Sequence, residues 1–127
     1  MSESRPRIAV VGASQDRSKF GNKAVRAFVA QGWEVFPVNP TLNEVEGLRA
    51  YPDLASIPAG RLDRVSLYVP PQVGLRVLDQ IKNADVAEVW LNPGAESSEL
   101  LAHAQELGID LIQACSIVDV GEDPHSY

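Results

Sequence analysis

Short, largely apolar segments alternate with amphipathic segments of about ten residues, and this alternation restricts the fold more than any other feature. The apolar segments, which are typical of buried strands, are residues 8–11, 34–38, 64–69, 88–91 and 109–113. Apolar side chains at helical spacing occur between them, in residues 22–31, 73–83 and 97–107. Strands separated by helices form βαβ units with parallel strands, and apolar strands require cover on both faces. We therefore predict an α/β fold: a Rossmann-like, doubly wound, mostly parallel sheet of about five or six strands with helices on both faces.

The remaining segments are consistent with one domain. We expect residues 41–60 to be mostly irregular, with a short strand at 48–50 and a helical turn near 53–56. The chain has 127 residues, close to the commonest domain size, and no internal repeat or low-complexity tract divides it. We therefore expect residues 1–127 to form a single domain, with a loose tail at 121–127.

Composition and charge disfavour several functional classes. The hydrophobic content of 45% is ordinary for a globular protein, and no apolar run approaches the ~18 residues of a membrane span. Residues 1–7 lack the apolar stretch of a signal peptide, and the single cysteine, Cys115, fits a reducing compartment, so we expect a cytoplasmic protein. The net charge of −6 argues against binding to nucleic acid or to an anionic membrane. Residues 1–32 are nevertheless net positive, which indicates either a site for a small anion or a chance distribution of surface charge.

The loop from Gly12 to Gly21 joins the first predicted strand to the first predicted helix. Main-chain amides at a helix start lack partners and lie at the positive end of the helix dipole, so they favour a phosphate. In the alternative interpretation, Ser18 is only a helix cap and the cations are solvated. The loop is neither a GxGxxG nor a Walker motif. Hydroxyl donors and cations available to a phosphate are Ser14, Ser18, Arg17, Lys19 and Lys23.

The end of the second predicted strand argues against a dinucleotide. Enzymes that use NAD place an acidic residue there to hold the ribose hydroxyls, and those that use NADP have an arginine nearby. Here the strand ends in Val38, Asn39 and Pro40. NAD and NADP are therefore disfavoured, and the apolar turn instead offers a flat surface to an adenine ring.

Several strings in this order resemble a known family. They are Ile8-Ala-Val-Val-Gly-Ala-Ser14, Gly32-Trp-Glu-Val-Phe-Pro-Val-Asn-Pro40, Tyr68-Val-Pro70, Glu88-Val-Trp-Leu-Asn-Pro-Gly94 and Gly108-Ile-Asp-Leu-Ile. Together they resemble the small stand-alone CoA-binding domain proteins, which are similar to the N-terminal CoA-binding domain of the succinyl-CoA synthetase α subunit. The resemblance covers most of the chain.

The resemblance implies coenzyme A or an acyl-CoA as the ligand, and a site at the ends of the strands. The residues implied to hold the CoA phosphates are Gly12, Ala13 and Ser14, with Lys19 as the matching cation. Those implied to border the adenosine part are Val38, Asn39 and Pro40, and Tyr51 falls where the small proteins carry an aromatic residue. Val69 and Pro70 are implied to line the pantetheine arm, and Asn92, Pro93 and Gly94 to lie near the thiol.

The chain also departs from its relatives. The synthetase carries Pro-Gly-Lys-Gly-Gly after its second strand, whereas this chain reads Pro40-Thr-Leu-Asn-Glu and so lacks the lysine that contacts the 3′-phosphate. The stand-alone proteins often carry Asp-Arg-Cys after the last strand, where this chain has Gln113-Ala-Cys115. The synthetase's phosphorylated histidine belongs to a second domain that the resemblance does not cover.

The sequence contains no convincing catalytic set. We interpret His103 and His125 as surface residues, Cys115 as either an inert buried thiol or a reactive one, and no acidic cluster as a metal site. The first hypothesis is therefore non-catalytic binding of CoA or an acyl-CoA. The alternatives are a CoA-presenting subunit of an acyl-CoA ligase or transferase, and a sensor of NAD(H) or an adenine nucleotide. A protein partner or a homodimer remains open.

Overall fold

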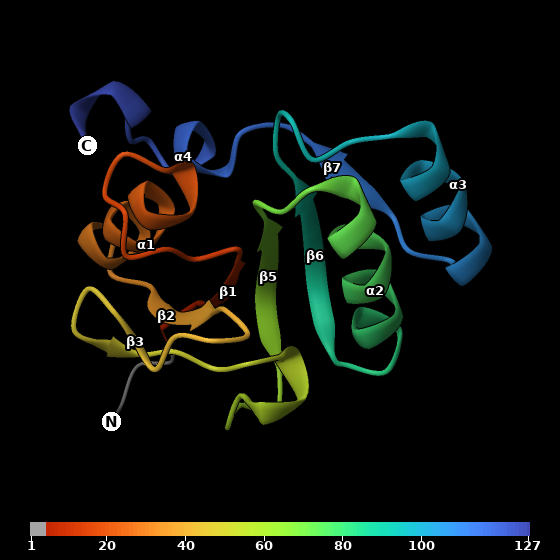
Figure 1. The fold of residues 1–127 in the computed structure, drawn as a ribbon, viewed down its shortest axis with the longest axis horizontal. Coiled ribbons are helices and arrows are strands. Elements are labelled where there is room, and N and C mark those ends of the chain that lie inside the picture. Colours follow the sequence, from red (N-terminus) through yellow and green to blue (C-terminus); the bar gives the residue numbers. More distant parts are fainter. Residues whose placement is uncertain (1–4) are drawn as a thin grey trace.

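Five parallel strands form the central sheet of the computed structural model, which describes residues 5–127 (Figure 1). The strands are β1 (Arg7–Val11), β2 (Glu34–Val38), β5 (Leu62–Leu67), β6 (Val86–Leu91) and β7 (Leu111–Gln113). Their order across the sheet is β2-β1-β5-β6-β7, and every neighbouring pair is parallel. The strand order reverses between β1 and β5. In an open parallel sheet, a ligand binds outside the carboxyl ends of the strands at such a point.

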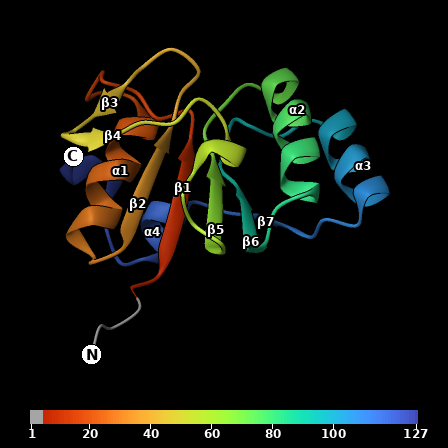
Figure 2. The same cartoon turned by 90° about the horizontal axis from the view of Figure 1, so that it is seen from below.

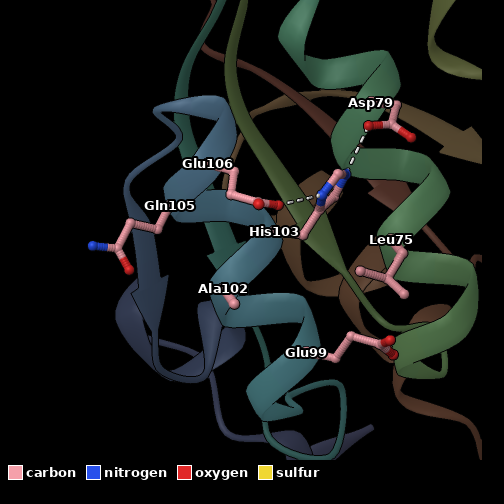
Figure 3. A pocket seen from close by; sticks show the side chains of 7 residues that line it. All are labelled: Leu75, Asp79, Glu99, Ala102, His103, Gln105 and Glu106. Atoms are coloured by element: carbon pink, nitrogen blue, oxygen red, sulfur yellow. Dashed lines mark hydrogen bonds and ion pairs between the residues drawn. The ribbon is translucent and has the colours of Figure 1, made fainter.

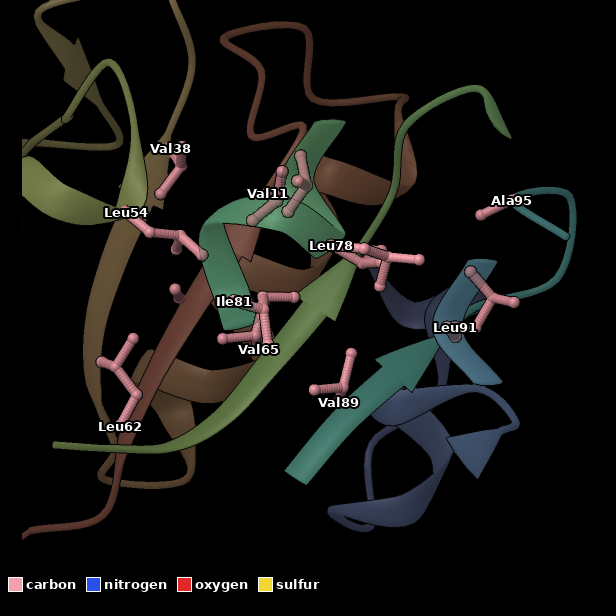
Figure 4. Packing of buried hydrophobic residues seen from close by; sticks show 14 of the residues in the cluster. Val11, Val38, Leu54, Leu62, Val65, Leu78, Ile81, Val89, Leu91 and Ala95 are labelled. Carbon is pink, nitrogen blue, oxygen red and sulfur yellow. The ribbon is translucent and has the colours of Figure 1, made fainter. Parts of the chain in front are cut away.

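Helices cover both faces of the sheet. One face carries α2 (Pro71–Lys82) and α3 (Ser98–Leu107), and the other carries α1 (Phe20–Ala30) and α4 (Ser116–Asp119) (Figure 2). On the first face, Leu78 and Ile81 of α2 pack on Val65 and Val89 of the strands (Figure 4). The predicted doubly wound α/β fold is therefore confirmed. None of the helices within residues 5–127 has the length and apolar character that crossing a membrane requires.

The structure shifts several of the predicted boundaries. α1 begins at Phe20 instead of residue 22, because the Phe20 side chain is 52% exposed and so falls outside the apolar periodicity. α2 begins at Pro71 instead of residue 73, since proline is well tolerated at the first position of a helix. β5 begins at Leu62 and includes the buried Arg64, a charge that sequence patterns place at a boundary. α4 was not predicted, because four residues are too few to show a helical period.

The segment between β2 and β5 contains a small hairpin outside the main sheet. β3 (Glu44–Val45) and β4 (Leu48–Arg49) pair antiparallel, so the strand expected at 48–50 belongs to a hairpin outside the main sheet. The expected turn near 53–56 is a 3₁₀-helix, Leu54–Ser56, whose first turn is capped by the Asp53 carboxylate. Tyr51 bridges to Val38 and thereby extends the β2 edge of the sheet.

The C-terminal residues, where a loose tail was expected, pack against α1. A short 3₁₀-helix, Pro124–Ser126, precedes Tyr127, whose hydroxyl donates to Glu122 at 2.6 Å. The Arg26 guanidinium of α1 lies 5.2 Å from the centre of the Tyr127 ring. Gln31, which follows α1, also donates to the Glu122 carboxylate.

Arg64 attaches α4 to the middle of the sheet. Its side chain is only 7% exposed, and it binds Glu88 of β6 at 3.2 Å and Asp119 of α4 at 2.9 Å. The guanidinium also lies 4.1 Å from the centre of the Trp90 ring, a cation–π contact in which this tryptophan packs on the charge. A buried charge is tolerated when it is paired in this way. The ion pair with Asp119 therefore fixes α4 on the face that carries α1.

Candidate functional site

Two glycines bring the first loop, the end of β5 and the start of α1 into close contact. Gly12 has a φ of 94°, and a Cβ there would lie 2.4 Å from the Tyr68 carbonyl oxygen. A Cβ on Gly21 would lie 2.0 Å from the Gly12 carbonyl oxygen. Both distances are far below van der Waals contact, so only glycine fits without a shift of the backbone. The N-terminus of α1 is thereby held directly at the switch point of the sheet.

The N-terminus of α1 has no side-chain cap. Lys19 occupies the N-cap position without capping the helix, and the Ser18 hydroxyl donates to Asp16 at 2.7 Å instead. This hydrogen bond, together with one from the Ser18 amide, lowers the pKa of the Asp16 carboxyl. Within residues 5–127, the amides of Phe20 and Gly21 have no hydrogen-bond partner. They lie at the positive end of the helix dipole and can donate hydrogen bonds to an anion.

A hollow of about 470 Å³ is lined by Phe20 and Gly21, the residues that carry these two amides. Its walls are the start of α1, the connection from β5 to α2 and the loop after β6: residues 19–21, 68–71 and 93–95, together with Gly12. Lys19 is the charged residue among them. The hollow therefore combines free amides, one cation and apolar walls.

A second hollow, of about 190 Å³, lies where β1, β2 and β5 end beside α2. Its lining is mostly apolar and includes Val38 and Pro40, with Asp53, Arg76 and Gln80 as its polar members. Gly12 and Val69 line both hollows. The two hollows therefore adjoin at the point where the strand order reverses.

The structure brings most of the predicted site residues to these hollows. Those that line one or both are Gly12, Lys19, Val38, Pro40, Val69, Pro70, Pro93 and Gly94. The residues that the sequence singled out and that lie elsewhere are Ala13, Ser14, Asn39, Tyr51 and Asn92.

Ala13, Ser14 and Asn39 support the first loop from behind. Ala13 is fully buried, and its amide and that of Gly12 both donate to the Val38 carbonyl at 3.2 and 3.1 Å. Ser14 Oγ accepts from the Asp16 amide at 3.0 Å. Asn39 Nδ2 donates to the Ala13 carbonyl at 2.9 Å. The amides of Gly12 and Ala13 therefore already have a partner, whereas those of Phe20 and Gly21 have none within residues 5–127.

The side chains of Tyr51 and Asn92 make contacts within the protein and line neither hollow. The Tyr51 ring packs on Phe36, with 6.0 Å between the ring centres, at the β2 edge of the sheet. Asn92 is 2% exposed, and its amide group donates to Ser66 Oγ at 2.7 Å and to the Leu67 carbonyl at 3.0 Å. Its Oδ1 accepts from the Ser116 amide at 2.9 Å. The side chain of Asn92 thus joins β5, β6 and α4.

Sequence reasoning missed four residues of the hollows that carry polar groups. Asp53, Arg76 and Gln80 line the smaller hollow, and Tyr68 lines the larger one. Within the described residues, the buried Tyr68 hydroxyl has no hydrogen-bond partner, and burial raises the pKa of Tyr68 well above its ordinary value. A periodic pattern shows that α2 is amphipathic, but it does not reveal which turn borders a cavity. The sequence therefore contained no sign that Arg76 lines a hollow.

The chain matches a known family, and its fold matches several solved structures. Residues 6–121 match the CoA binding domain. The chain belongs to this family. A solved structure of a conserved hypothetical protein from Pyrococcus furiosus has the same fold: it is 35% identical with a TM-score of 0.81, and the match covers 90% of this chain and 98% of that one.

Two relatives differ in the share of their own length that the match covers. An uncharacterized protein of Bacillus subtilis, YneT, is 29% identical over 106 residues, which are 84% of this chain and 78% of the relative. The α subunit of the ADP-forming acetate–CoA ligase II of Pyrococcus furiosus is 31% identical over 116 residues. That match covers 83% of this chain but 25% of the ligase subunit, so the chain spans about a quarter of it.

A third hollow, of about 700 Å³, lies apart from the other two, between the outer sides of α2 and α3 (Figure 3). Its charged lining consists of Asp79, Glu99, Glu106 and His103. Three carboxylates make it unfavourable for a phosphate-bearing ligand. His103 Nε2 lies 2.8 Å from Asp79 and Nδ1 lies 3.5 Å from Glu106, and the bond to Asp79 is the main reason that the pKa of His103 is raised.

The other residues considered for chemistry lie apart from both hollows. Cys115 is partly buried and packs on the apolar cluster under α1 and α4, and His125 is exposed in the C-terminal 3₁₀-helix. Residues 5–127 bring no three His, Cys, Asp or Glu side chains together in an arrangement that would hold a metal ion.

Proposed function

We propose that this CoA-binding domain holds coenzyme A or an acyl-CoA along the carboxyl edge of its sheet and performs no chemistry of its own. The observation that carries the proposal is the uncapped N-terminus of α1. The amides of Phe20 and Gly21 are free there, beside Lys19 and at the switch point of the sheet. The diphosphate of CoA supplies the anion that such amides favour.

The two hollows account for the two ends of this ligand. The smaller one has apolar walls and suits a single ring system, so it would take the adenine, against Val38 and Pro40. The larger one would take the start of the pantetheine arm between Val69, Pro70 and Pro93. Bound CoA supplies a thiol that can carry an acyl group. The domain's part is to bind the diphosphate and hold both arms in place.

The lining of the larger hollow supports a holding role. Within residues 5–127, no histidine or carboxylate side chain lines it. Glu96 lies nearby, but its Oε1 accepts from the Gly94 amide at 3.0 Å. An acid or base for acyl transfer at this hollow would therefore come from a partner.

A second candidate function follows from the similarity to the acetate–CoA ligase α subunit. In this version the domain presents the CoA thiol to a separate chain or domain that forms the acyl-CoA. Both candidates require the same binding site, and they differ in whether a partner is needed. The partner is tested by adding CoA, acetate and ADP or ATP to a purified complex, not to this chain alone.

The test of the binding proposal is calorimetric titration of the purified chain with CoA, acetyl-CoA, ATP and NAD, accompanied by native mass spectrometry. We expect CoA and acetyl-CoA to bind with one site per chain, and ATP and NAD to bind at least about tenfold more weakly. The proposal is wrong if NAD or ATP binds while CoA produces no heat. Preferential binding of NAD would support the nucleotide-sensor alternative.

A substitution locates the anion within the site. Lys19→Gln removes the cation beside the free amides, and we expect CoA to bind about fivefold more weakly, with a smaller effect at high salt. The matched control is Lys82→Gln, which removes an equal charge at the far end of α2, where Lys82 binds the Leu107 carbonyl. Equal losses in both variants would attribute the effect to net charge instead of to this loop.

A further inference from the structure

The smaller hollow contains one polar side chain that makes no hydrogen bond or ion pair within residues 5–127. Its walls include the apolar side chains of Val11, Leu54 and Val77. Its polar members are Asp53, Arg76 and Gln80, and their hydrogen bonds separate them into two kinds.

Asp53 and Gln80 serve the local backbone. Asp53 Oδ1 accepts from the Ser56 amide at 2.9 Å and from the Ser56 hydroxyl at 2.7 Å, so it caps the 3₁₀-helix. Gln80 Oε1 accepts from the Leu54 amide at 3.2 Å. Arg76 differs from both: within residues 5–127 its guanidinium has no hydrogen bond and no ion pair, and its side chain is exposed.

Arg76 and Lys19 lie in different hollows and so can meet different groups of a ligand. Lys19 lines the larger hollow beside the amides of α1, whereas Arg76 lines the smaller hollow together with Val38 and Pro40 from the end of β2. A ligand that extends through both hollows would meet one cation in each. The loop after β2, which reads Pro40-Thr-Leu-Asn-Glu, supplies no cation.

We propose that Arg76 binds the 3′-phosphate of the adenosine end of the ligand, so that the domain selects 3′-phosphorylated adenine nucleotides over their dephosphorylated forms. This inference rests on the proposed function. A guanidinium presents a planar fork that binds a phosphate through two parallel hydrogen bonds. Arg76 also offsets the charge of Asp53, which would otherwise repel a phosphate in the same hollow.

The test compares pairs of ligands that differ only in the 3′-phosphate. The pairs are CoA with dephospho-CoA, and adenosine 3′,5′-bisphosphate with AMP. In the unmodified chain we expect the phosphorylated member of each pair to bind about tenfold more tightly, by an amount that falls as salt is raised. In Arg76→Gln the difference should shrink to about twofold or less, while dephospho-CoA binds as before. Arg76→Lys should keep part of it, since the charge remains but the fork is lost.

The matched control is Arg61→Gln, which removes the same charge from an exposed position before the amino end of β5. It should leave the discrimination intact, and the melting temperatures of both variants verify folding. If CoA binds and Arg76→Gln still discriminates, or if the unmodified chain does not discriminate, the inference about Arg76 is overturned while the proposed function stands. If neither CoA nor dephospho-CoA binds the unmodified chain, the proposed function itself fails.

Discussion

Two strand-to-helix connections at the same edge of the sheet satisfy their backbone groups in opposite ways. The β6–α3 connection is closed by its own side chains: Asn92 forms three buried hydrogen bonds, and Ser97 caps α3 by accepting from the Leu100 amide at 3.1 Å. The β1–α1 connection leaves the start of its helix uncapped, with the amides of Phe20 and Gly21 free. A helix start with internal partners belongs to the scaffold, whereas one without them is available to a ligand.

Residue type alone does not identify a binding residue at a strand end. Both connections carry glycine and polar residues after an apolar strand. What separates them is whether the polar groups have partners inside the protein. Substitutions in the two connections should therefore divide into those that remove ligand binding and those that only lower stability.

The largest effect is expected from Gly21→Ala in the β1–α1 connection. The added Cβ would lie 2.0 Å from the Gly12 carbonyl oxygen, and main chain cannot yield as a side chain does. We expect the free energy of unfolding to fall by at least about 3 kcal/mol, with loss of CoA binding. Urea denaturation and calorimetry measure the two quantities.

Gly74→Ala in α2 is the matched control for this substitution. Its Cβ would meet Leu100 Cδ1 at 2.6 Å, but that atom is the far end of a flexible side chain. Alanine also has the higher helix propensity, so we expect a change within about 1 kcal/mol. Similar stabilities for the two variants would mean that the close approach of Gly21 to Gly12 does not hold α1 in place.

Asn92→Ala should have the second-largest effect, on stability alone. It leaves the Ser116 amide and the Leu67 carbonyl without their buried partner, and we expect a loss of about 2 to 3 kcal/mol. CoA affinity should stay within about twofold. The exposed Asn83, substituted in the same way, should change stability by about 0.5 kcal/mol or less. A tenfold loss of affinity in Asn92→Ala would place this side chain at the ligand and remove the contrast between the connections.

The fold could be predicted from the sequence because the strands are short apolar runs and the long helices have apolar residues at helical spacing. Burial of both sheet faces required apolar strands such as 8–11, and the helices between them made the sheet parallel. α4 could not be predicted, because it is held by Arg64 and Asn92, which are distant in the chain. These two polar residues are buried by pairing, and a local pattern does not show pairing.

The sequence could propose residues at the strand ends, but it could not show which amides have partners. Of the proposed residues, Gly12, Val38 and Val69 lie beside the hollows. The sequence also predicted phosphate contacts at Gly12, Ala13 and Ser14, and the amides of Gly12 and Ala13 donate to the Val38 carbonyl. Which amide is free depends on how neighbouring strands end, and that information is not local.

Ser97→Ala should have a moderate effect on the β6–α3 connection. It removes the cap of α3, and loss of a serine cap costs about 1 kcal/mol. Ser98→Ala, one residue further on and exposed, should change stability by about 0.5 kcal/mol or less. Thermal denaturation of both variants measures the difference, and CoA affinity should be unchanged in each. Weaker CoA binding in Ser97→Ala alone would show that the cap of α3 also supports the ligand site.

The smallest effect on stability is expected from substitution of His103, which joins α3 to α2 through Asp79. Its hydrogen bonds to Asp79 and Glu106 raise its pKa, so the folded protein binds the proton more tightly than the unfolded chain does. The resulting stabilisation is fully present below the ordinary histidine pKa of about 6.5, and it is lost as the pH rises through the raised value. We therefore expect the melting temperature of the unmodified chain to fall slightly more than that of His103→Gln between about pH 5.5 and about pH 8.

The effect of His103 should be small because its side chain is 30% exposed and solvent screens the ion pairs. Equal pH dependence in the two proteins would show that these pairs contribute nothing to stability. CoA affinity measured over the same pH range tests whether the α2–α3 contact affects the site at α1. His103 lies between α2 and α3, away from the free amides of α1, so CoA affinity should follow the same pH curve in His103→Gln as in the unmodified chain. A difference in affinity would mean that the α2–α3 contact is coupled to the site, which the adjoining position of Arg76 on α2 would then explain.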